Sequence, residues 1–129
     1  MEDRVYLTWT DIEELVDSIC GRIITEIPNI DSIHGLPRGG LIPAVLISHR
    51  LDIPFATTVG KHTLVVDDIC DTGYTFQNAP GVYTAALHYK RTAKFRPTIY
   101  AKEVGDDWIV YPWEREDSKS IADYLLEKL

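Results

Sequence analysis

The sequence predicts an α/β domain with a mostly parallel central sheet that is flanked by helices. Segments with a helical period alternate along the chain with short runs of strand-forming residues, as in βαβ architecture. The 129 residues fit one domain, and a hydrophobic content of 45% is enough for one sizeable core. The run His62-Thr63-Leu64-Val65-Val66 is apolar and ends in acids, which is typical of a central parallel strand whose carboxyl end faces a site.

The first part of the chain is expected to contain two helices and one short strand. Val5–Thr8 is expected to be extended, and Thr10 is expected to begin a helix because Thr10 and Glu13 have the spacing of a capping box. Apolar residues then recur at helical spacing and form one stripe: Ile12, Leu15, Val16, Ile19 and Ile23. Ser32–Leu36 is predicted to be a strand and Leu41–Leu51 a second helix.

The second part of the chain contains three more strand candidates and a terminal helix. Strand-forming residues are concentrated in Val82–Tyr89, Thr98–Lys102 and Trp108–Tyr111. Ser118–Leu129 is predicted to be helical, with its apolar residues on one face: Ile121, Tyr124, Leu125 and Leu129.

The composition excludes several classes of protein. With 20 acidic and 13 basic side chains, the net charge of −7 argues against nucleic acid binding, which needs many cations to neutralise phosphates. A small phosphorylated ligand stays possible, because backbone N–H groups and a divalent cation can bind phosphate. Two cysteines without zinc spacing indicate neither a disulfide scaffold nor a zinc site. The sequence has no signal peptide and no apolar run that could cross a bilayer, so a cytoplasmic protein is expected.

An acid pair followed by a hydroxyl-rich turn is the most informative part of the sequence. Asp67 and Asp68 follow the apolar run, and adjacent carboxylates there suit two ribose hydroxyls, or a ribose and a hydrated Mg²⁺. Asp71–Thr75 then supply side-chain donors and acceptors, and Gly73 lets backbone N–H groups point inward to a phosphate. Alone, the acids could be a solvated strand end and the turn an ordinary turn. The combined pattern favours a phosphate site.

The stretch Leu64–Thr75 closely resembles the ribose-phosphate motif of type I phosphoribosyltransferases. The resemblance implies that Asp67 and Asp68 face the ribose hydroxyls and Mg²⁺, the expected metal cofactor. In purine-specific members, the acid that matches Asp71 lies near N7 of the base, where a positioned carboxylate can assist proton loss. The same resemblance implies that one loop wraps the 5-phosphate of 5-phosphoribosyl 1-pyrophosphate: Asp71, Thr72, Gly73, Tyr74 and Thr75.

A glycine-rich turn between Ser32–Leu36 and Leu41–Leu51 is a second candidate for phosphate binding. Gly39 and Gly40 allow a close backbone approach, and the planar guanidinium of Arg38 can hold phosphate oxygens. The alternative is a plain βα turn with a surface arginine. In the same family the matching loop binds pyrophosphate, often through a non-proline cis peptide. The resemblance makes the bond before Arg38 the cis candidate.

The C-terminal part of the chain resembles the 6-oxopurine members of this family, the xanthine-guanine and hypoxanthine phosphoribosyltransferases. Lys90 matches a lysine that donates to O6 of the purine and would repel the 6-amino group of adenine, a mispairing that costs about 1–3 kcal/mol. Lys102 is a competing candidate. Trp108 matches an aromatic residue that stacks on the base, although a simple core aromatic is the alternative. The backbone carbonyl of Ile109 is implied to receive base N–H groups, while Trp113 is expected to pack in the core.

The resemblance covers most of the chain and implies one domain, residues 1–129, with a small hood near residues 1–9 and 98–115. Two departures from the family are expected. Catalytic members carry a mobile hairpin that closes over the ligand, but Ile53–His62 leaves little room for it. The helix after the phosphate loop meets Pro80-Gly81 within about one turn. We expect that Lys61 and His62 supply part of the missing cover.

The sequence therefore predicts a Mg²⁺-dependent purine salvage enzyme. It would transfer a phosphoribosyl group from 5-phosphoribosyl 1-pyrophosphate to guanine, xanthine or hypoxanthine and release pyrophosphate. The family is commonly dimeric or tetrameric, so a homodimer or homotetramer is expected, without a nucleic acid or membrane partner. One alternative is a non-catalytic module that senses phosphoribosyl pyrophosphate or a nucleotide. The other is a phosphoribosyltransferase for a non-purine acceptor.

Overall fold

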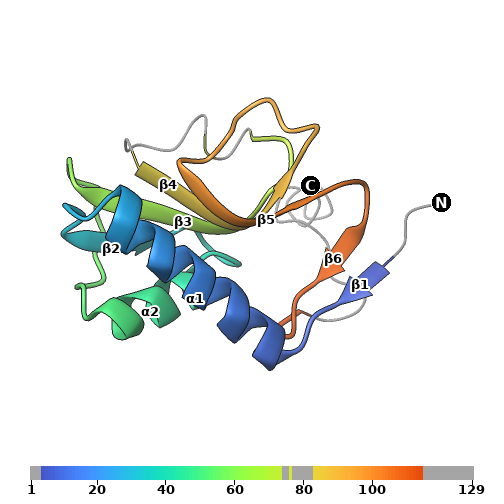
Figure 1. Cartoon of the computed structure of the whole chain (residues 1–129), viewed down its shortest axis with the longest axis horizontal. Helices are drawn as coiled ribbons and strands as arrows, with labels where there is room; N and C mark the ends of the chain where they lie inside the picture. Colours follow the sequence, from blue (N-terminus) through green and yellow to red (C-terminus); the bar gives the residue numbers. More distant parts are fainter. Residues whose placement is uncertain (1–3, 74–75, 77–82, 115–129) are drawn as a thin grey trace, which may run out of the picture.

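The structure of the chain, a computed structural model, describes residues 4–73, 76 and 83–114 (Figure 1). The expected helix at 118–129 and the Pro80-Gly81 break lie outside the described residues. So do two residues of the predicted phosphate loop, Tyr74 and Thr75.

A parallel four-stranded sheet forms the centre of the fold. The strands follow the order β2-β3-β4-β5, and each neighbouring pair is parallel. Their bounds are Ser32–Gly35 for β2, Thr63–Cys70 for β3, Tyr83–Lys90 for β4 and Ile99–Val104 for β5. The α/β class predicted from the sequence is confirmed. Because all four strands run the same way, the residues after their carboxyl ends share one edge of the sheet.

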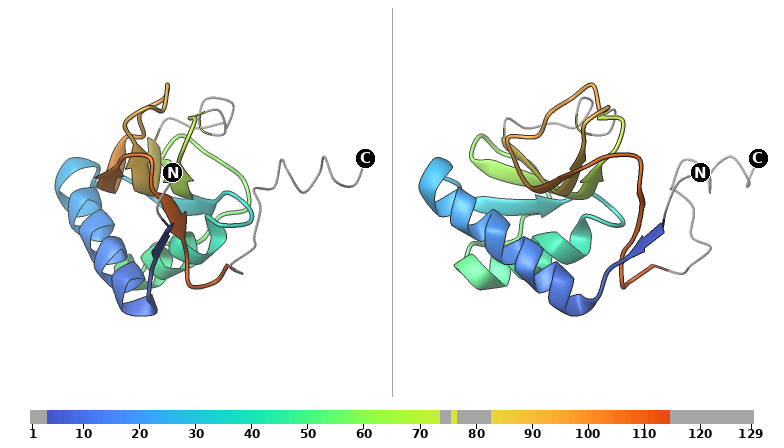
Figure 2. Two further views of the ribbon diagram at one scale, coloured as in Figure 1. Left: turned by 90° about the vertical axis from the view of Figure 1, so that its right-hand side faces the viewer. Right: turned by 45° about the vertical axis from the view of Figure 1, so that its right-hand side comes forward.

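Two helices cover one face of this sheet (Figures 1 and 2). The helix α1 (Trp9–Glu26) packs against β4 and β5, and α2 (Leu41–Leu51) packs against β2 and β3. The apolar stripe predicted for α1 faces the main core, in which Ile12, Val16 and Ile19 are almost completely buried. A smaller cluster contains Val65 and Phe76, and strand alternation places Val65 on the sheet face opposite the helices.

A separate two-stranded sheet joins the two ends of the described chain. The strands β1 (Arg4–Tyr6) and β6 (Trp108–Val110) pair in parallel, with Val5 opposite Ile109. Figure 2 shows this small sheet standing apart from the four-stranded sheet. The strand β1 thereby fixes the position of the segment that carries Trp108 and Ile109. None of the described helices has the length and apolar character that a membrane span requires.

The predicted start of the first helix is wrong by two residues. Thr8 is the N-cap: its hydroxyl accepts a hydrogen bond from the Asp11 N–H (3.1 Å), and the Asp11 carboxylate accepts one from the Thr8 N–H (2.8 Å). Thr10 and Glu13 have the right spacing but lie inside the helix. The Leu7 N–H donates to the Val110 carbonyl (2.9 Å), so pairing with the β6 segment keeps the chain extended up to Leu7. The turn into the helix therefore falls at Thr8.

The strand that carries the acid pair is longer than the apolar run alone indicates. It pairs with β4 as far as Cys70, which lies opposite Tyr89. Asp67 and Asp68 therefore lie within β3 and do not follow it. Ladder pairing outweighs the low strand propensity of aspartate here.

Replacing the observed cap tests this helix start. We expect Thr8→Ala to lower the free energy of unfolding by about 1 kcal/mol, because a backbone N–H of the first turn loses its acceptor. Thr10→Ala is the matched control and should change it by less than about 0.5 kcal/mol. Urea unfolding of both variants measures the difference, and an equal loss in both would contradict a cap at Thr8.

Candidate functional site

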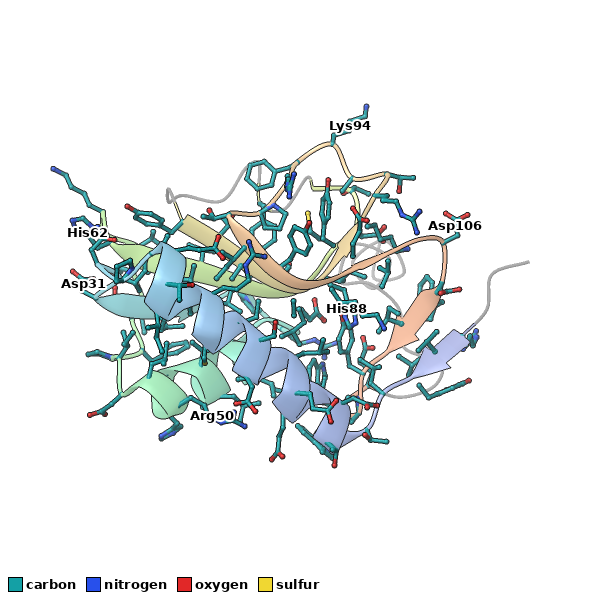
Figure 3. All side chains as sticks on the ribbon, in the orientation of Figure 1. Asp31, Arg50, His62, His88, Lys94 and Asp106 are labelled. Atoms are coloured by element: carbon teal, nitrogen blue, oxygen red, sulfur yellow. The ribbon has the colours of Figure 1, made fainter. Side chains whose placement is uncertain are left out.

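The candidate site lies where β2, β3 and β4 end. The turn 37–40 follows β2, Asp71 follows β3, and Lys90 is the last residue of β4. Residues that are far apart in the sequence therefore meet at one edge of the sheet. Asp31 and His62 precede β2 and β3 and lie at the opposite end of the sheet from His88 (Figure 3). The expectation that Lys61 and His62 cover the site is therefore wrong, because they lie at the amino end of β3.

The turn after β2 passes directly over the acid pair. A Cβ atom at Gly39 would collide with the Asp68 carboxylate, and one at Gly40 would collide with the Val66 carbonyl. Both positions therefore require glycine. The Pro37–Arg38 peptide bond is cis, as expected, and the Arg38 side chain is exposed. The turn thus places an arginine and closely packed backbone beside the carboxylates of β3.

The two acids of β3 form a half-buried pair of adjacent carboxyl groups. The Asp67 Oδ1 atom accepts from the Asp68 N–H, and the Asp68 Oδ1 atom accepts from the Ile69 N–H, both at 2.8 Å. Burial raises the pKa of both carboxyls, and the charge of Asp68 raises the pKa of Asp67 further. The site therefore favours partners that stabilise negative charge, such as a cation or hydroxyl groups.

The acid pair suits a metal ion that is shared with a ligand. Within the described part of the chain, no group of three or more His, Cys, Asp or Glu residues could hold a metal ion. Mg²⁺ commonly uses only one or two carboxylates and completes its octahedron with water and substrate phosphates. Asp67 and Asp68 fit that pattern. They do not fit a structural metal held by protein ligands alone.

An ion pair joins the ends of β3 and β4. The Lys90 Nζ atom lies 3.3 Å from the Asp71 Oδ1 atom. The Lys90 side chain is only 14% exposed, whereas that of Asp71 is 57% exposed. Lys102, the competing candidate, lies within β5 opposite His88 and is exposed. The geometry therefore favours Lys90 as the lysine of the site.

The connection between β4 and β5, residues 91–98, packs against the predicted phosphate loop. The Lys94 N–H donates to the Thr72 carbonyl (3.0 Å), and the Cys70 thiol donates to the Phe95 carbonyl (3.2 Å). Gly73 has a φ of 87°, and a Cβ atom there would lie 2.5 Å from the Phe95 Cβ. This glycine is thus needed for its left-handed backbone and for the approach of Phe95. The sequence analysis did not identify Phe95, because it carries no polar group and belongs to no motif.

The two tryptophans near β6 have different environments. Trp108 is 40% exposed, so the alternative of a simple core aromatic is wrong. Trp113 packs against the main core, as expected, and stacks on the Tyr111 ring at 4.9 Å with an interplanar angle of 10°. Ile109, the residue after Trp108, is 9% exposed and belongs to the main core. Trp108 is therefore available to a ligand while its neighbours hold the segment in place.

Two buried polar residues beside the acid pair were missed by the sequence analysis. The Tyr111 hydroxyl donates to the Asp68 backbone carbonyl (3.0 Å) and lies 2.8 Å from His88 Nδ1. Burial lowers the pKa of His88 to about 4, and the positive charge of Lys102 adds to this effect. Burial also raises the pKa of Tyr111. A histidine inside an otherwise apolar strand was the available signal.

The connection between α2 and β3 contains no hairpin, as expected. The Ile33 N–H donates to the Pro54 carbonyl, and the Ile33 carbonyl accepts from the Ala56 N–H. These two bonds form an isolated parallel bridge between Phe55 and Ile33 of β2. The chain then turns at Gly60, whose N–H donates to the Thr63 hydroxyl (2.8 Å), and enters β3. All of residues 52–62 are described, so the long catalytic hairpin is absent from this connection.

Comparisons with known proteins agree with this geometry. No protein-family model matches the chain. The xanthine-guanine phosphoribosyltransferase of Nitratidesulfovibrio vulgaris Hildenborough is 25% identical over 138 residues, covering 85% of this chain and 84% of that protein. The purine phosphoribosyltransferase of Pyrococcus horikoshii OT3 is 29% identical, with a TM-score of 0.76 over 92% of this chain and 99% of that chain. In sequence and in fold, the chain is similar to type I phosphoribosyltransferases over most of its length.

The fold comparison extends over the whole chain. The xanthine-guanine-hypoxanthine phosphoribosyltransferase of Helicobacter pylori has a TM-score of 0.77 over 100% of both chains, although only 17% of the residues are identical. The first two proteins are named as phosphoribosyltransferases, which are transferases, so the chain is assigned to the transferase class.

Neutralising one acid of the pair should stabilise the protein when metal is removed. A carboxyl whose pKa is raised by folding destabilises the folded state above its unfolded pKa, and this cost grows as pH rises. In EDTA at pH 8, we expect Asp67→Asn to raise the free energy of unfolding by about 1–2 kcal/mol. The gain should shrink as pH falls, because both states then hold the proton. Asp106→Asn, at an exposed site, is the control, and an equal gain there would contradict the burial of charge at Asp67.

His88 should make the protein less stable in mild acid. Its pKa is lowered to about 4 in the folded state, so below about pH 6.5 the unfolded chain gains a proton that the folded chain does not. This group therefore reduces stability by up to about 1.4 kcal/mol for each pH unit between those values. We expect His88→Gln to lose that slope in urea unfolding between pH 6.5 and 4.5. Identical slopes in the variant and the parent would show that His88 is not held neutral.

Proposed function

We propose that this phosphoribosyltransferase transfers a phosphoribosyl group from 5-phosphoribosyl 1-pyrophosphate to a 6-oxopurine and releases pyrophosphate. The observation that carries the proposal is the position of Lys90. Its largely buried ammonium lies 3.3 Å from Asp71, at the sheet edge that also holds the acid pair. An ammonium donor and a carboxylate acceptor side by side match the O6 and N7–H sides of a 6-oxopurine.

The sugar diphosphate would occupy the sheet edge between the two turns. Arg38 and the backbone of Gly39 and Gly40 would hold the pyrophosphate. Asp67 and Asp68 would position the ribose hydroxyls and bind Mg²⁺, which supplies charge neutralisation for the pyrophosphate when it is bound. The 5-phosphate would lie in the loop of Thr72, Gly73, Tyr74 and Thr75.

The proposed reaction depends on how the substrates and the charged side chains are oriented, and it needs no covalent intermediate with the protein. A purine nitrogen forms a bond to C1 of the ribose while the bond from C1 to the pyrophosphate oxygen breaks. The transition state should resemble an oxocarbenium ion, which the Asp67 and Asp68 carboxylates can stabilise. Asp71 would accept the proton that the base loses. Lys90, the exposed face of Trp108 and the Ile109 carbonyl would select and hold the base.

A non-catalytic binding module is the second candidate. The observation that favours it is the short connection at 52–62, which provides no hairpin to exclude water from the sugar diphosphate. Such a module would keep the phosphate and ribose contacts and sense phosphoribosyl pyrophosphate or a nucleotide. In either case we expect small-molecule ligands, a cytoplasmic location and a homodimer or homotetramer.

An activity assay separates the two candidates. The protein is mixed with Mg²⁺, 5-phosphoribosyl 1-pyrophosphate and guanine, xanthine, hypoxanthine or adenine, and nucleotide and pyrophosphate are measured. We expect product from at least one 6-oxopurine and none from adenine. Tight binding of the sugar diphosphate without product would instead support the binding module.

The same assay tests the lysine assignment. We expect Lys90→Ala to lower kcat/KM for the 6-oxopurine about 10- to 100-fold, because the O6 acceptor loses its donor. The KM for the sugar diphosphate should stay within about threefold of the parent value, since Lys90 is assigned to the base. Lys102→Ala is the matched comparison and should leave both values unchanged. The opposite pattern would assign the base to Lys102.

A further inference from the structure

We infer that Tyr111 is a positioning residue that fixes the base side of the site against the acid pair, and that His88 orients its hydroxyl. This inference rests on the proposed function, because it concerns how the base-binding segment is held. It adds two residues that contact neither base nor sugar in the proposed arrangement.

Tyr111 connects two parts of the site directly. It follows β6, the strand that carries Trp108 and Ile109, and it is 2% exposed. Its hydroxyl donates to the backbone carbonyl of Asp68 at 3.0 Å. One hydrogen bond therefore joins the segment assigned to the base with the strand assigned to the ribose and metal.

The direction of this hydrogen bond follows from chemistry. A backbone carbonyl can only accept, so the single hydroxyl proton of Tyr111 must point to Asp68. The hydroxyl oxygen then accepts from His88 Nδ1, which lies 2.8 Å away and must carry a proton. His88 is 2% exposed, and its low pKa keeps the imidazole neutral near pH 7, so one tautomer is selected.

The Tyr111 ring is held by contacts on other sides. Its face stacks on Trp113 at 4.9 Å, and Trp113 in turn lies against Trp9 with the ring centroids 5.9 Å apart. Its backbone N–H donates to the Glu114 carboxylate at 2.9 Å. The hydroxyl is therefore directed at Asp68 before any ligand binds.

The series of hydrogen bonds joins two strands of the site, β3 and β4, to the segment that follows β6. It runs from Asp68 on β3 through Tyr111 beyond β6 to His88 on β4, two residues before Lys90. Among the described strands, β6 pairs only with the short strand β1. Since no hairpin at 52–62 closes on the ligand, the position of the base relative to C1 of the ribose depends on such fixed contacts.

A paired substitution separates positioning from mere stability. Tyr111→Phe removes the hydroxyl and leaves buried His88 without its acceptor, so the thermal midpoint should fall. Tyr111→Phe combined with His88→Leu removes both polar partners, so the midpoint should recover at least half of that loss. We expect kcat/KM for the 6-oxopurine to be about 10-fold lower in both variants, with the KM for the sugar diphosphate within about threefold of the parent.

Tyr100→Phe is the matched control. The Tyr100 hydroxyl, on β5, accepts a hydrogen bond from the exposed Arg96 of the 91–98 connection. Loss of this hydroxyl should leave both kinetic values unchanged. If kcat/KM for the purine recovers together with the thermal midpoint in the double variant, Tyr111 is only structural and the inference is overturned. An equal loss for purine and sugar diphosphate would overturn it as well.

A binding measurement keeps this test separate from the test of the proposed function. Calorimetry compares guanosine 5′-monophosphate and inosine 5′-monophosphate with ribose 5-phosphate, so that the affinity added by the base is measured without turnover. A protein that forms no product but shows this added affinity would refute the proposed activity alone. Loss of the added affinity in the double variant would then support the positioning role, and its retention would overturn it. Absence of any added affinity in the parent protein overturns both.

Discussion

The parallel pairing of β3 with β2 and β4 is the constraint on which the site depends. It brings the turn after β2, the acids of β3 and the last residue of β4 to one edge of the sheet. The two central strands are held by buried apolar runs, Leu64–Val66 in β3 and Ala85–Leu87 in β4. A slip of two residues would preserve the faces of the sheet but move Lys90 away from Asp71. The core therefore determines the register, and the register determines the site.

The acid pair shows how function opposes stability in this fold. Two adjacent carboxylates are held within a central strand, where burial and mutual repulsion disfavour their charged forms. The Gly39–Gly40 turn packs so closely over them that no side chain fits at either position. A pair of apolar residues at these positions would stabilise the folded state more than the two carboxyl groups do. The proposed ligand would account for this arrangement, because it would bring a cation and hydroxyl groups to this edge.

Fixed contacts hold the elements around the candidate site in place. The connection 91–98 packs beside the predicted phosphate loop. The Phe95 ring contacts the Phe76 ring, the Phe95 carbonyl accepts from the Cys70 thiol, and the Lys94 N–H donates to the Thr72 carbonyl. On the other side, Tyr111 ties the β6 segment to Asp68. Both contacts are made by parts of the chain that follow β4. The elements around the site are thus held by static packing, and residues 52–62 have no hairpin to add to it.

Local sequence patterns were enough to predict the α/β class, the bounds of α2 at Leu41–Leu51, the cis bond before Arg38 and the absence of a hairpin after α2. These features depend on local periodicity, on the length of one connection or on a motif of contiguous residues. Three contacts became known only from the folded structure: Thr8 caps α1, Phe95 packs against Gly73, and the Tyr111 hydroxyl donates to the Asp68 carbonyl. Each of these contacts depends on a pairing between distant segments, as when β6 keeps Leu7 extended. The spacing of residues in the sequence does not show which distant segments will pack together. That packing depends on hydrophobic burial over the whole chain.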